Sequence, residues 1–143
     1  MIRFLSRSTR ETEEFAAAFA EKLRPGDVIA CRGGMGAGKT AFARGLARGL
    51  GLTDEVSSPT FALVHEYTHG NISLYHFDMY RVSGFDELYS TGFFDYLEQD
   101  GVLYIEWSEN IDFALDFPHI TVEIAPGAEE DERVITIKGD GRF

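Results

Sequence analysis

A glycine-rich segment near the start of the chain has residue types and a spacing that suit phosphate binding. It reads Gly33-Gly34-Met35-Gly36-Ala37-Gly38-Lys39-Thr40, which matches G-x-x-x-x-G-K-[ST] at every fixed position. Gly36 and Gly38 let the backbone fold around an anion with its N–H groups turned inward. Lys39 supplies a positive charge for the β- and γ-phosphates, and the Thr40 hydroxyl is a ligand for Mg²⁺. The segment therefore predicts a nucleotide-phosphate site.

The sequence on either side of this loop supports that interpretation. Residues 28–31 form a short apolar run that predicts a buried strand, and residues 39–50 predict a helix with Phe42, Leu46 and Leu50 on one face. A helix that begins at the loop adds its positive N-terminal end to the phosphate site. A strand before the loop and a helix after it favour a functional phosphate loop over a structural glycine turn.

Two carboxylates follow apolar runs that read as strands. Residues 72–77 predict a strand that ends at Asp78, and residues 102–105 predict one that ends at Glu106. Ligands of parallel sheets lie at the carboxyl ends of the strands, so both side chains could face the phosphates. One could hold the metal and the other orient the attacking water, or either could cap the turn that follows. The residue types and their spacing do not decide which of the two carboxylates has which task.

Other polar residues give weaker signals. The turn at residues 57–60 places the Thr60 hydroxyl after a proline, which fits either a loop that senses the γ-phosphate or an ordinary turn. Arg81 is expected at the surface, and the lone Cys31 is expected in the core because its neighbours are apolar. No zinc site is predicted, since metal-ligand spacing is missing among His65, His69, His76 and His119, and His76, beside the strand end at Asp78, is expected to be a core or rim histidine.

The rest of the chain alternates short strands with helices. Further strands are predicted at residues 2–5 and 61–67, and at 120–124 and 134–137 as a hairpin around Pro126-Gly127. Further helices are predicted at residues 9–23, 85–89 and 92–98. This alternation favours one α/β domain over residues 1–143, with a largely parallel central sheet flanked by helices and a C-terminal β-hairpin.

Charge and hydropathy narrow the functional class. The chain has 13 Lys and Arg against 24 Asp and Glu, a formal net charge of −11. That charge repels phosphate backbones, so contact with RNA is expected only through a partner. No apolar stretch approaches the roughly 18–20 residues of a membrane span. Acidic residues follow the N-terminal arginines at once, which argues against a transit peptide, so a cytoplasmic location is expected.

Four motifs occur in a fixed order: the phosphate loop, Ser58-Pro59-Thr60-Phe61, His76-Phe77-Asp78-Met79-Tyr80-Arg81, and Glu106-Trp107. Together they resemble the TsaE (YjeE) family, the ATPase component of the bacterial machinery that makes threonylcarbamoyladenosine at position 37 of tRNA. The resemblance covers residues 8–110 and implies a P-loop NTPase fold. It implies that Lys39 and Thr40 bind ATP phosphates and Mg²⁺, that Glu106 is a second metal ligand, and that Asp78 is needed for hydrolysis.

The same resemblance implies further contacts and partners. Thr60 would belong to a switch-like loop near the γ-phosphate, and the adenine would lie near Thr9. The partners would be the TsaD–TsaB pair, in which TsaD transfers the threonylcarbamoyl group to tRNA and ATP hydrolysis by the TsaE-like chain resets the complex. Trp107 would lie near the nucleotide.

Two other classes share the phosphate loop. A small-molecule kinase usually needs an arginine-bearing lid, but residues 88–116 contain no lysine or arginine. A nucleotide-dependent binding module would use ATP only to order a loop around a partner, and it would need the same residues as a hydrolase. A regulatory GTPase is disfavoured because the chain has no Asn-Lys-x-Asp segment.

Overall fold

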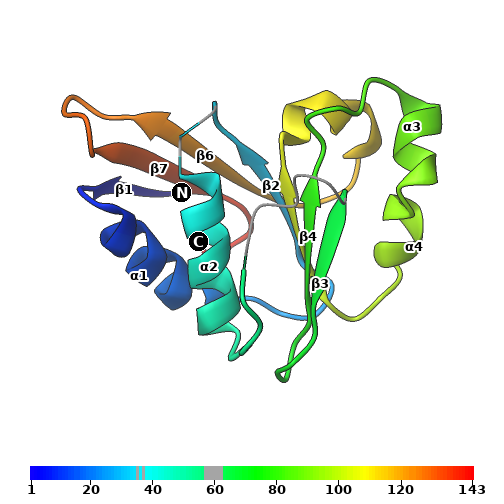
Figure 1. Cartoon of the computed structure of the whole chain (residues 1–143), viewed down its shortest axis with the longest axis horizontal. Helices are drawn as coiled ribbons and strands as arrows, with labels where there is room; N and C mark the ends of the chain where they lie inside the picture. Colours follow the sequence, from blue (N-terminus) through cyan, green and yellow to red (C-terminus); the bar gives the residue numbers. More distant parts are fainter. Residues whose placement is uncertain (35, 37, 57–62) are drawn as a thin grey trace.

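The computed structural model describes residues 1–34, 36, 38–56 and 63–143. One seven-stranded sheet has the order β1-β7-β6-β2-β5-β4-β3 and separates two helical layers (Figure 1). The strands are β1 Ile2–Ser6, β2 Val28–Arg32, β3 Val64–Tyr67, β4 Leu74–Asp78, β5 Val102–Glu106, β6 Ile120–Pro126 and β7 Arg133–Lys138. The helices are α1 Thr9–Ala20, α2 Lys39–Gly49, α3 Phe85–Ser90, α4 Phe93–Tyr96 and the 3₁₀ segment η1 Ser108–Ala114.

The centre of the sheet is parallel. Strands β6, β2, β5 and β4 pair in parallel, whereas β7 and β1 on one side and β3 on the other pair antiparallel. All of β5 and the first four residues of β2 and β4 are buried, which suits strands covered on both faces. The predicted α/β class, the parallel centre and the C-terminal hairpin of β6 and β7 are confirmed.

Helices α1 and α2 cover one face of the sheet and pack closely on each other. The Ser8 hydroxyl accepts a hydrogen bond of 3.1 Å from the backbone N–H of Glu11 and so caps α1. Helix α1 ends at Ala20, three residues before the predicted end at residue 23, in a turn closed by the Leu23 N–H and the Ala20 carbonyl. A Cβ built on Gly45 in α2 would lie 2.3 Å from the Glu13 carbonyl oxygen, so the approach requires glycine.

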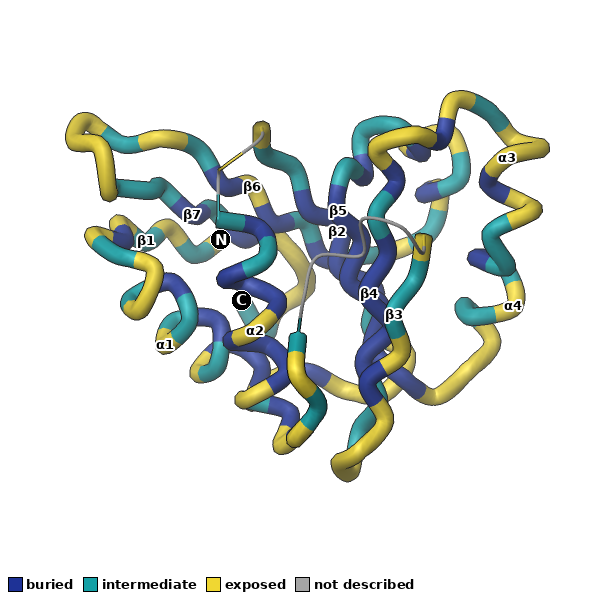
Figure 2. The backbone as a smooth tube through the Cα atoms, in the orientation of Figure 1, coloured by how far each residue is buried: buried dark blue, intermediate teal, exposed yellow. Residues whose placement is uncertain are grey.

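Two cores lie on opposite faces of the sheet. The core under α1 and α2 includes Phe19, Phe42 and Tyr104, and the core under α3 and α4 includes Phe77 and Phe93. Figure 2 shows the central strands buried between them, while much of α3 is exposed. The two layers therefore clamp the central strands and fix the positions of their carboxyl ends.

Some elements differ from the sequence predictions. Strand β4 begins at Leu74 and includes Asp78, so it lies slightly later than predicted, and the η1 segment was not predicted at all. The predicted turn at residues 57–60 and residues 61–62 lie outside the described residues. Within the described part of the chain, no helix is long and apolar enough to cross a bilayer.

Candidate nucleotide-binding site

The glycine-rich loop joins β2 to the first turn of α2. Gly36 and Gly38 have φ values of 72° and 99°, in the left-handed region where glycine is strongly preferred. A Cβ on either residue would meet nothing within 4 Å, so backbone conformation and not space demands glycine there. Gly38 caps α2 and, having no side chain, makes no side-chain hydrogen bond to the backbone N–H groups at the helix N-terminus. Backbone donors at such an end suit a phosphate. Ala37 lies outside the described residues, and Gly33 directly follows β2.

Lys39 is the first residue of α2 and is only 6% exposed. Its Nζ atom has no hydrogen-bond partner among the described residues and lies 3.7 Å from the centroid of the Trp107 ring. Burial lowers the pKa of the Lys39 ammonium, while the nearby Glu106 carboxylate acts in the opposite direction. A buried ammonium without an acceptor is costly, so this one is well placed to receive an anionic ligand.

Asp78 and Glu106 lie opposite each other at the ends of neighbouring parallel strands. Glu106 is 4% exposed, whereas Asp78 is half-buried. One Asp78 oxygen, Oδ1, accepts a 2.9 Å hydrogen bond from the Tyr80 backbone N–H, so part of this carboxylate stabilises the turn after β4. The pairing of strands therefore brings the two predicted acidic residues together, and both act on the Lys39 ammonium through their charge.

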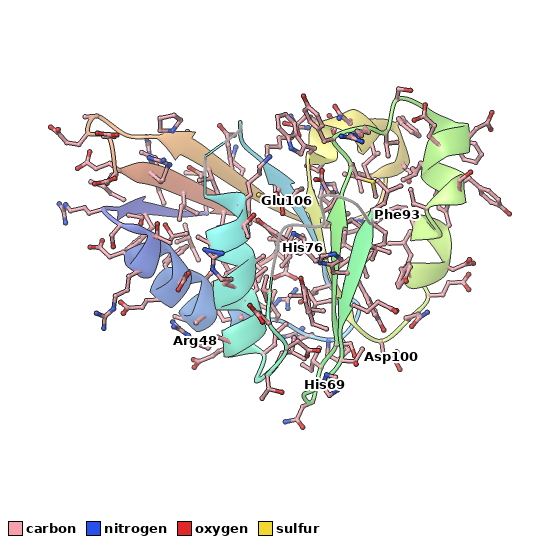
Figure 3. All side chains as sticks on the ribbon, in the orientation of Figure 1. Arg48, His69, His76, Phe93, Asp100 and Glu106 are labelled. Carbon is pink, nitrogen blue, oxygen red and sulfur yellow. The ribbon has the colours of Figure 1, made fainter. Side chains whose placement is uncertain are left out.

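His76 is a contact of Glu106 that the sequence interpretation missed. Its Nε2–H donates a hydrogen bond to Glu106 Oε2, and the imidazole is 0% exposed (Figure 3). The imidazole also lies 5.2 Å from the Tyr104 ring, centroid to centroid. The expectation of a core histidine is right about burial, but His76 also fixes the Glu106 side chain. Strand periodicity carried a signal, because His76 and Asp78 are two apart and share a face.

The Tyr104 side chain of β5 links the central sheet to the end of the phosphate loop, where α2 begins. Its hydroxyl donates a 2.8 Å hydrogen bond to the Lys39 carbonyl and lies 3.3 Å from Cys31 Sγ. Cys31 is 0% exposed, which confirms its expected place in the core. Burial raises the pKa of the Cys31 thiol to about 12, so it stays protonated and acts as an apolar side chain.

A pocket of about 340 Å³ lies beside the loop, between the start of α1 and the β6–β7 hairpin. Its lining residues are Ser8, Thr9, Thr12, Gly36, Gly38, Ala41, Asp131 and Arg133. Thr9, which was expected near the adenine, is thus brought next to Gly36 and Gly38. The Arg133 guanidinium donates a 3.0 Å hydrogen bond to the Gly36 carbonyl. No local sequence pattern predicts this contact of Arg133, because Gly36 lies 97 residues away in the chain.

The donor set near the loop suits a hard cation. No group of three or more His, Cys, Asp or Glu side chains able to hold a metal is found within the described residues. The Thr40 hydroxyl and the Glu106 and Asp78 carboxylates are oxygen donors, which Mg²⁺ prefers together with phosphate oxygens and water. The residues present therefore fit Mg²⁺ carried with a nucleotide. Thr60 lies outside the described residues.

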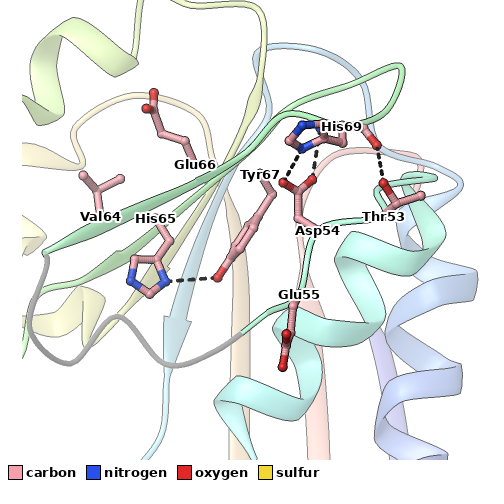
Figure 4. Close-up of a pocket in the computed structure, with 8 residues that line it drawn as sticks. All are labelled: Thr53, Asp54, Glu55, Val64, His65, Glu66, Tyr67 and His69. Carbon is pink, nitrogen blue, oxygen red and sulfur yellow. Dashed lines mark hydrogen bonds and ion pairs between the residues drawn. The ribbon is translucent and has the colours of Figure 1, made fainter.

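A second, wider pocket of about 700 Å³ lies between the segment that follows α2 and strand β3 with the turn after it (Figure 4). Its lining residues are Thr53, Asp54, Glu55, Val64, His65, Glu66, Tyr67 and His69. Asp54 Oδ2 and His69 Nδ1 are hydrogen-bonded at 2.7 Å, and this hydrogen bond lowers the pKa of Asp54. Among the described residues, none of those predicted for phosphate or metal binding lines this pocket.

Comparison with known proteins agrees with the motifs. A family model described as "Threonylcarbamoyl adenosine biosynthesis protein TsaE" matches residues 6–135. The chain belongs to the TsaE family. This confirms the resemblance that the four motifs predicted.

Individual TsaE proteins are similar over most of their length. The Treponema pallidum protein named "tRNA threonylcarbamoyladenosine biosynthesis protein TsaE" is 38% identical over 124 residues, 87% of this chain and 90% of its own length. The protein of the same name from Bacillus subtilis is 40% identical over 131 residues, 92% of this chain and 81% of its own. The crystal structure of Bacillus subtilis YdiB superposes with a TM-score of 0.81 at 35% identity, covering 98% of this chain and 86% of that one.

Proposed function

We propose that this TsaE-family chain is a Mg²⁺-dependent ATP hydrolase that acts with the TsaD–TsaB pair in the threonylcarbamoyladenosine modification of tRNA position 37. The observation that carries the proposal is the Lys39 ammonium, which is buried at the N-terminus of α2, has no acceptor among the described residues and interacts with the Glu106 charge. The names of its relatives support the pathway. The cytoplasm is the compartment that suits this role.

Each residue near the loop has a separate task in this proposal. Lys39 and the loop N–H groups, Ala37 and Gly33 included, bind the β- and γ-phosphates and spread the charge that develops during transfer. Thr40 and Glu106 hold the metal, and Asp78 orients the water or the metal's own water shell. Mg²⁺, when bound, neutralises phosphate charge and positions the phosphoryl group.

The remaining contacts would position the nucleotide. The pocket beside Thr9 receives the base and ribose, and Arg133 lies at its wall. Thr60 belongs to the loop that reports the γ-phosphate, as the family resemblance implies. The net charge of −11 supports contact with tRNA only indirectly, through the partner proteins.

The test is steady-state ATP hydrolysis by this chain, alone and with its cognate TsaD–TsaB pair. Lys39→Ala serves as the inactive control, and Arg48→Ala serves as the matched control because Arg48 is an exposed cation on the same helix. We expect Mg²⁺-dependent hydrolysis that the pair stimulates in the wild type and in Arg48→Ala but not in Lys39→Ala.

Other outcomes would overturn separate parts of the proposal. Hydrolysis that persists in Lys39→Ala would exclude the assigned site. Tight ATP binding without turnover, with or without the pair, would instead indicate a nucleotide-dependent binding module. Phosphate transfer to a small molecule in place of water would indicate a kinase.

A further inference from the structure

The outer side of α3 and α4 exposes a cluster of aromatic rings. Phe85 and Tyr89 are 58% and 67% exposed, and the half-buried Phe94, which also packs against the core, completes the cluster. The ring centroids of Phe85 and Phe94 are 5.7 Å apart, and those of Phe85 and Tyr89 are 6.2 Å apart. We call these three residues the aromatic face. Large apolar side chains grouped at the surface are typical of a protein contact site.

The inner side of the same helices accounts for their folding. Leu88 and Phe93 are buried, and the Phe93 ring packs edge-on against Phe77 at 5.7 Å. Phe85 and Tyr89 are four residues apart in α3 and point outward, away from this core. Phe94 contributes to that core, but Phe85 and Tyr89 are not needed to anchor α3 and α4, and their exposure calls for another explanation.

The charges around the aromatic face have one sign. Asp86, Glu87 and Asp95 are exposed next to the three rings, and none of them forms an ion pair with the described part of the chain. Between Arg81 and Arg133 the sequence contains no lysine or arginine. Carboxylates attract cations, and aromatic rings attract the same cations through their π faces.

We propose that the aromatic face is a docking surface for a protein partner that presents arginine or lysine side chains around an apolar contact. Arginine suits this surface best, because it pairs with carboxylates and stacks on aromatic rings. Nucleic acid and anionic lipid would be repelled by the same carboxylates. A symmetric dimer would place Asp86 and Asp95 near their own copies, which disfavours a second copy of this chain as the occupant.

This inference rests on the proposed function, because the TsaD–TsaB pair is the partner used to test it. The face lies on the opposite side of the sheet from the core under α1 and α2, yet α3 begins seven residues after Asp78 at the phosphate end of the sheet (Figure 1). A partner docked there would contact the layer next to the candidate site and leave the phosphate loop accessible.

The experiment measures binding of the purified cognate TsaD–TsaB pair to the full chain by isothermal titration calorimetry. Phe85→Ala/Tyr89→Ala should weaken binding by at least about tenfold. Asp86→Lys/Asp95→Lys should weaken it roughly three- to tenfold and reduce its salt dependence. The matched control is Glu14→Lys/Glu21→Lys, which reverses one exposed carboxylate on α1 and one at its C-cap and should bind as the wild type does. A fluorescent ATP analogue, bound equally by all variants, shows that each is folded.

The outcomes separate this inference from the function on which it rests. If the wild type binds the pair and all variants bind it equally, the docking surface is wrong while the proposed function stands. If the wild type does not bind the pair at all, the proposed function and the docking surface both fail. A dimer of the chain alone that Phe85→Ala/Tyr89→Ala dissociates would also overturn the inference, since the occupant would be a second copy.

Discussion

The two helical layers meet the sheet in different ways. In the α1–α2 layer, small residues allow close backbone contact, as where a Cβ on Gly45 or Gly49 would lie 2.3 Å from the carbonyl oxygens of Glu13 and Ala17. In the α3–α4 layer, two short helices are attached through large rings such as Phe93, and they expose others such as Tyr89. The first layer contains the phosphate loop at the start of α2.

The two layers are therefore suited to different tasks. The α1–α2 layer can position a bound ligand, and the α3–α4 layer can present exposed rings to a partner. Close backbone packing tolerates little displacement, so it fixes the start of α2 and the Lys39 ammonium relative to Glu106. Contacts through a few large side chains need less of the helix surface, which leaves Phe85 and Tyr89 exposed. Substitutions at the close contacts and the loop of the first layer should therefore change nucleotide binding or stability, while those at Phe85 and Tyr89 should change neither.

The largest expected effect is on nucleotide affinity, from Lys39→Ala. Removing a charged group that contacts phosphate should cost about 1.5–3 kcal/mol, or roughly 10- to 150-fold in Kd. The measurement is titration with a fluorescent ATP analogue in the presence of Mg²⁺. Arg48→Ala, at an exposed cation of the same helix, should bind normally. Equal affinity in Lys39→Ala would show that the α1–α2 layer does not position the phosphate site.

A second effect concerns the histidine that holds Glu106. His76→Phe removes the donor to Glu106 Oε2 and should lower hydrolysis about 10- to 100-fold, as losses of partners of metal ligands do. The Mg²⁺ concentration needed for half-maximal activity should rise, while binding of ADP without Mg²⁺ should stay unchanged. His76→Gln, which retains a donor, should recover part of the loss. If His76→Phe and His76→Gln both lost ADP binding, His76 would stabilise the fold and would have no separate effect on Glu106.

The contact of His76 with Glu106 also marks a limit of inference from sequence. The loop pattern and the strand ends were enough to predict Lys39, Asp78 and Glu106 as neighbours, because parallel strands carry their carboxyl ends to one edge. The structure places Asp78 opposite Glu106 as that rule requires. His76 was missed because a histidine in an apolar strand is usually a core residue, so its shared face with Asp78 was not weighed, and its partner lies 30 residues away.

Long-range contacts account for the other omissions. The sequence predicted β1 as a strand but not its antiparallel pairing with β7, which closes one side of the sheet. The hydrogen bond from Arg133 to Gly36 depends on that same C-terminal hairpin. Both contacts follow from how distant segments pack and not from any local propensity. The α3 and α4 helices, in contrast, were predicted from local sequence: α3 matches its predicted range of 85–89 within one residue, and α4 covers only Phe93–Tyr96 of the predicted 92–98.

A third effect tests the close packing of the α1–α2 layer directly. Gly45→Ala should favour α2 by about 1 kcal/mol on helix propensity alone. The added Cβ would meet Glu13 backbone 2.3 Å away, so the protein should instead lose about 1–3 kcal/mol of unfolding free energy. Urea unfolding followed by circular dichroism measures the change, and Arg48→Ala is again the control. A more stable Gly45→Ala variant would show that the two helices separate easily.

The smallest expected effect is at the aromatic face. Tyr89 is 67% exposed, so Tyr89→Ala should change the unfolding free energy by no more than about 0.5 kcal/mol. Leu88→Ala, one residue away but fully buried, should cost about 2–5 kcal/mol in the same urea titration. If Tyr89→Ala were as destabilising as Leu88→Ala, the ring would belong to the core of the α3–α4 layer. The α3–α4 layer would then no longer differ from the closely packed α1–α2 layer, because its outer rings would be needed for stability and would not be left for a partner.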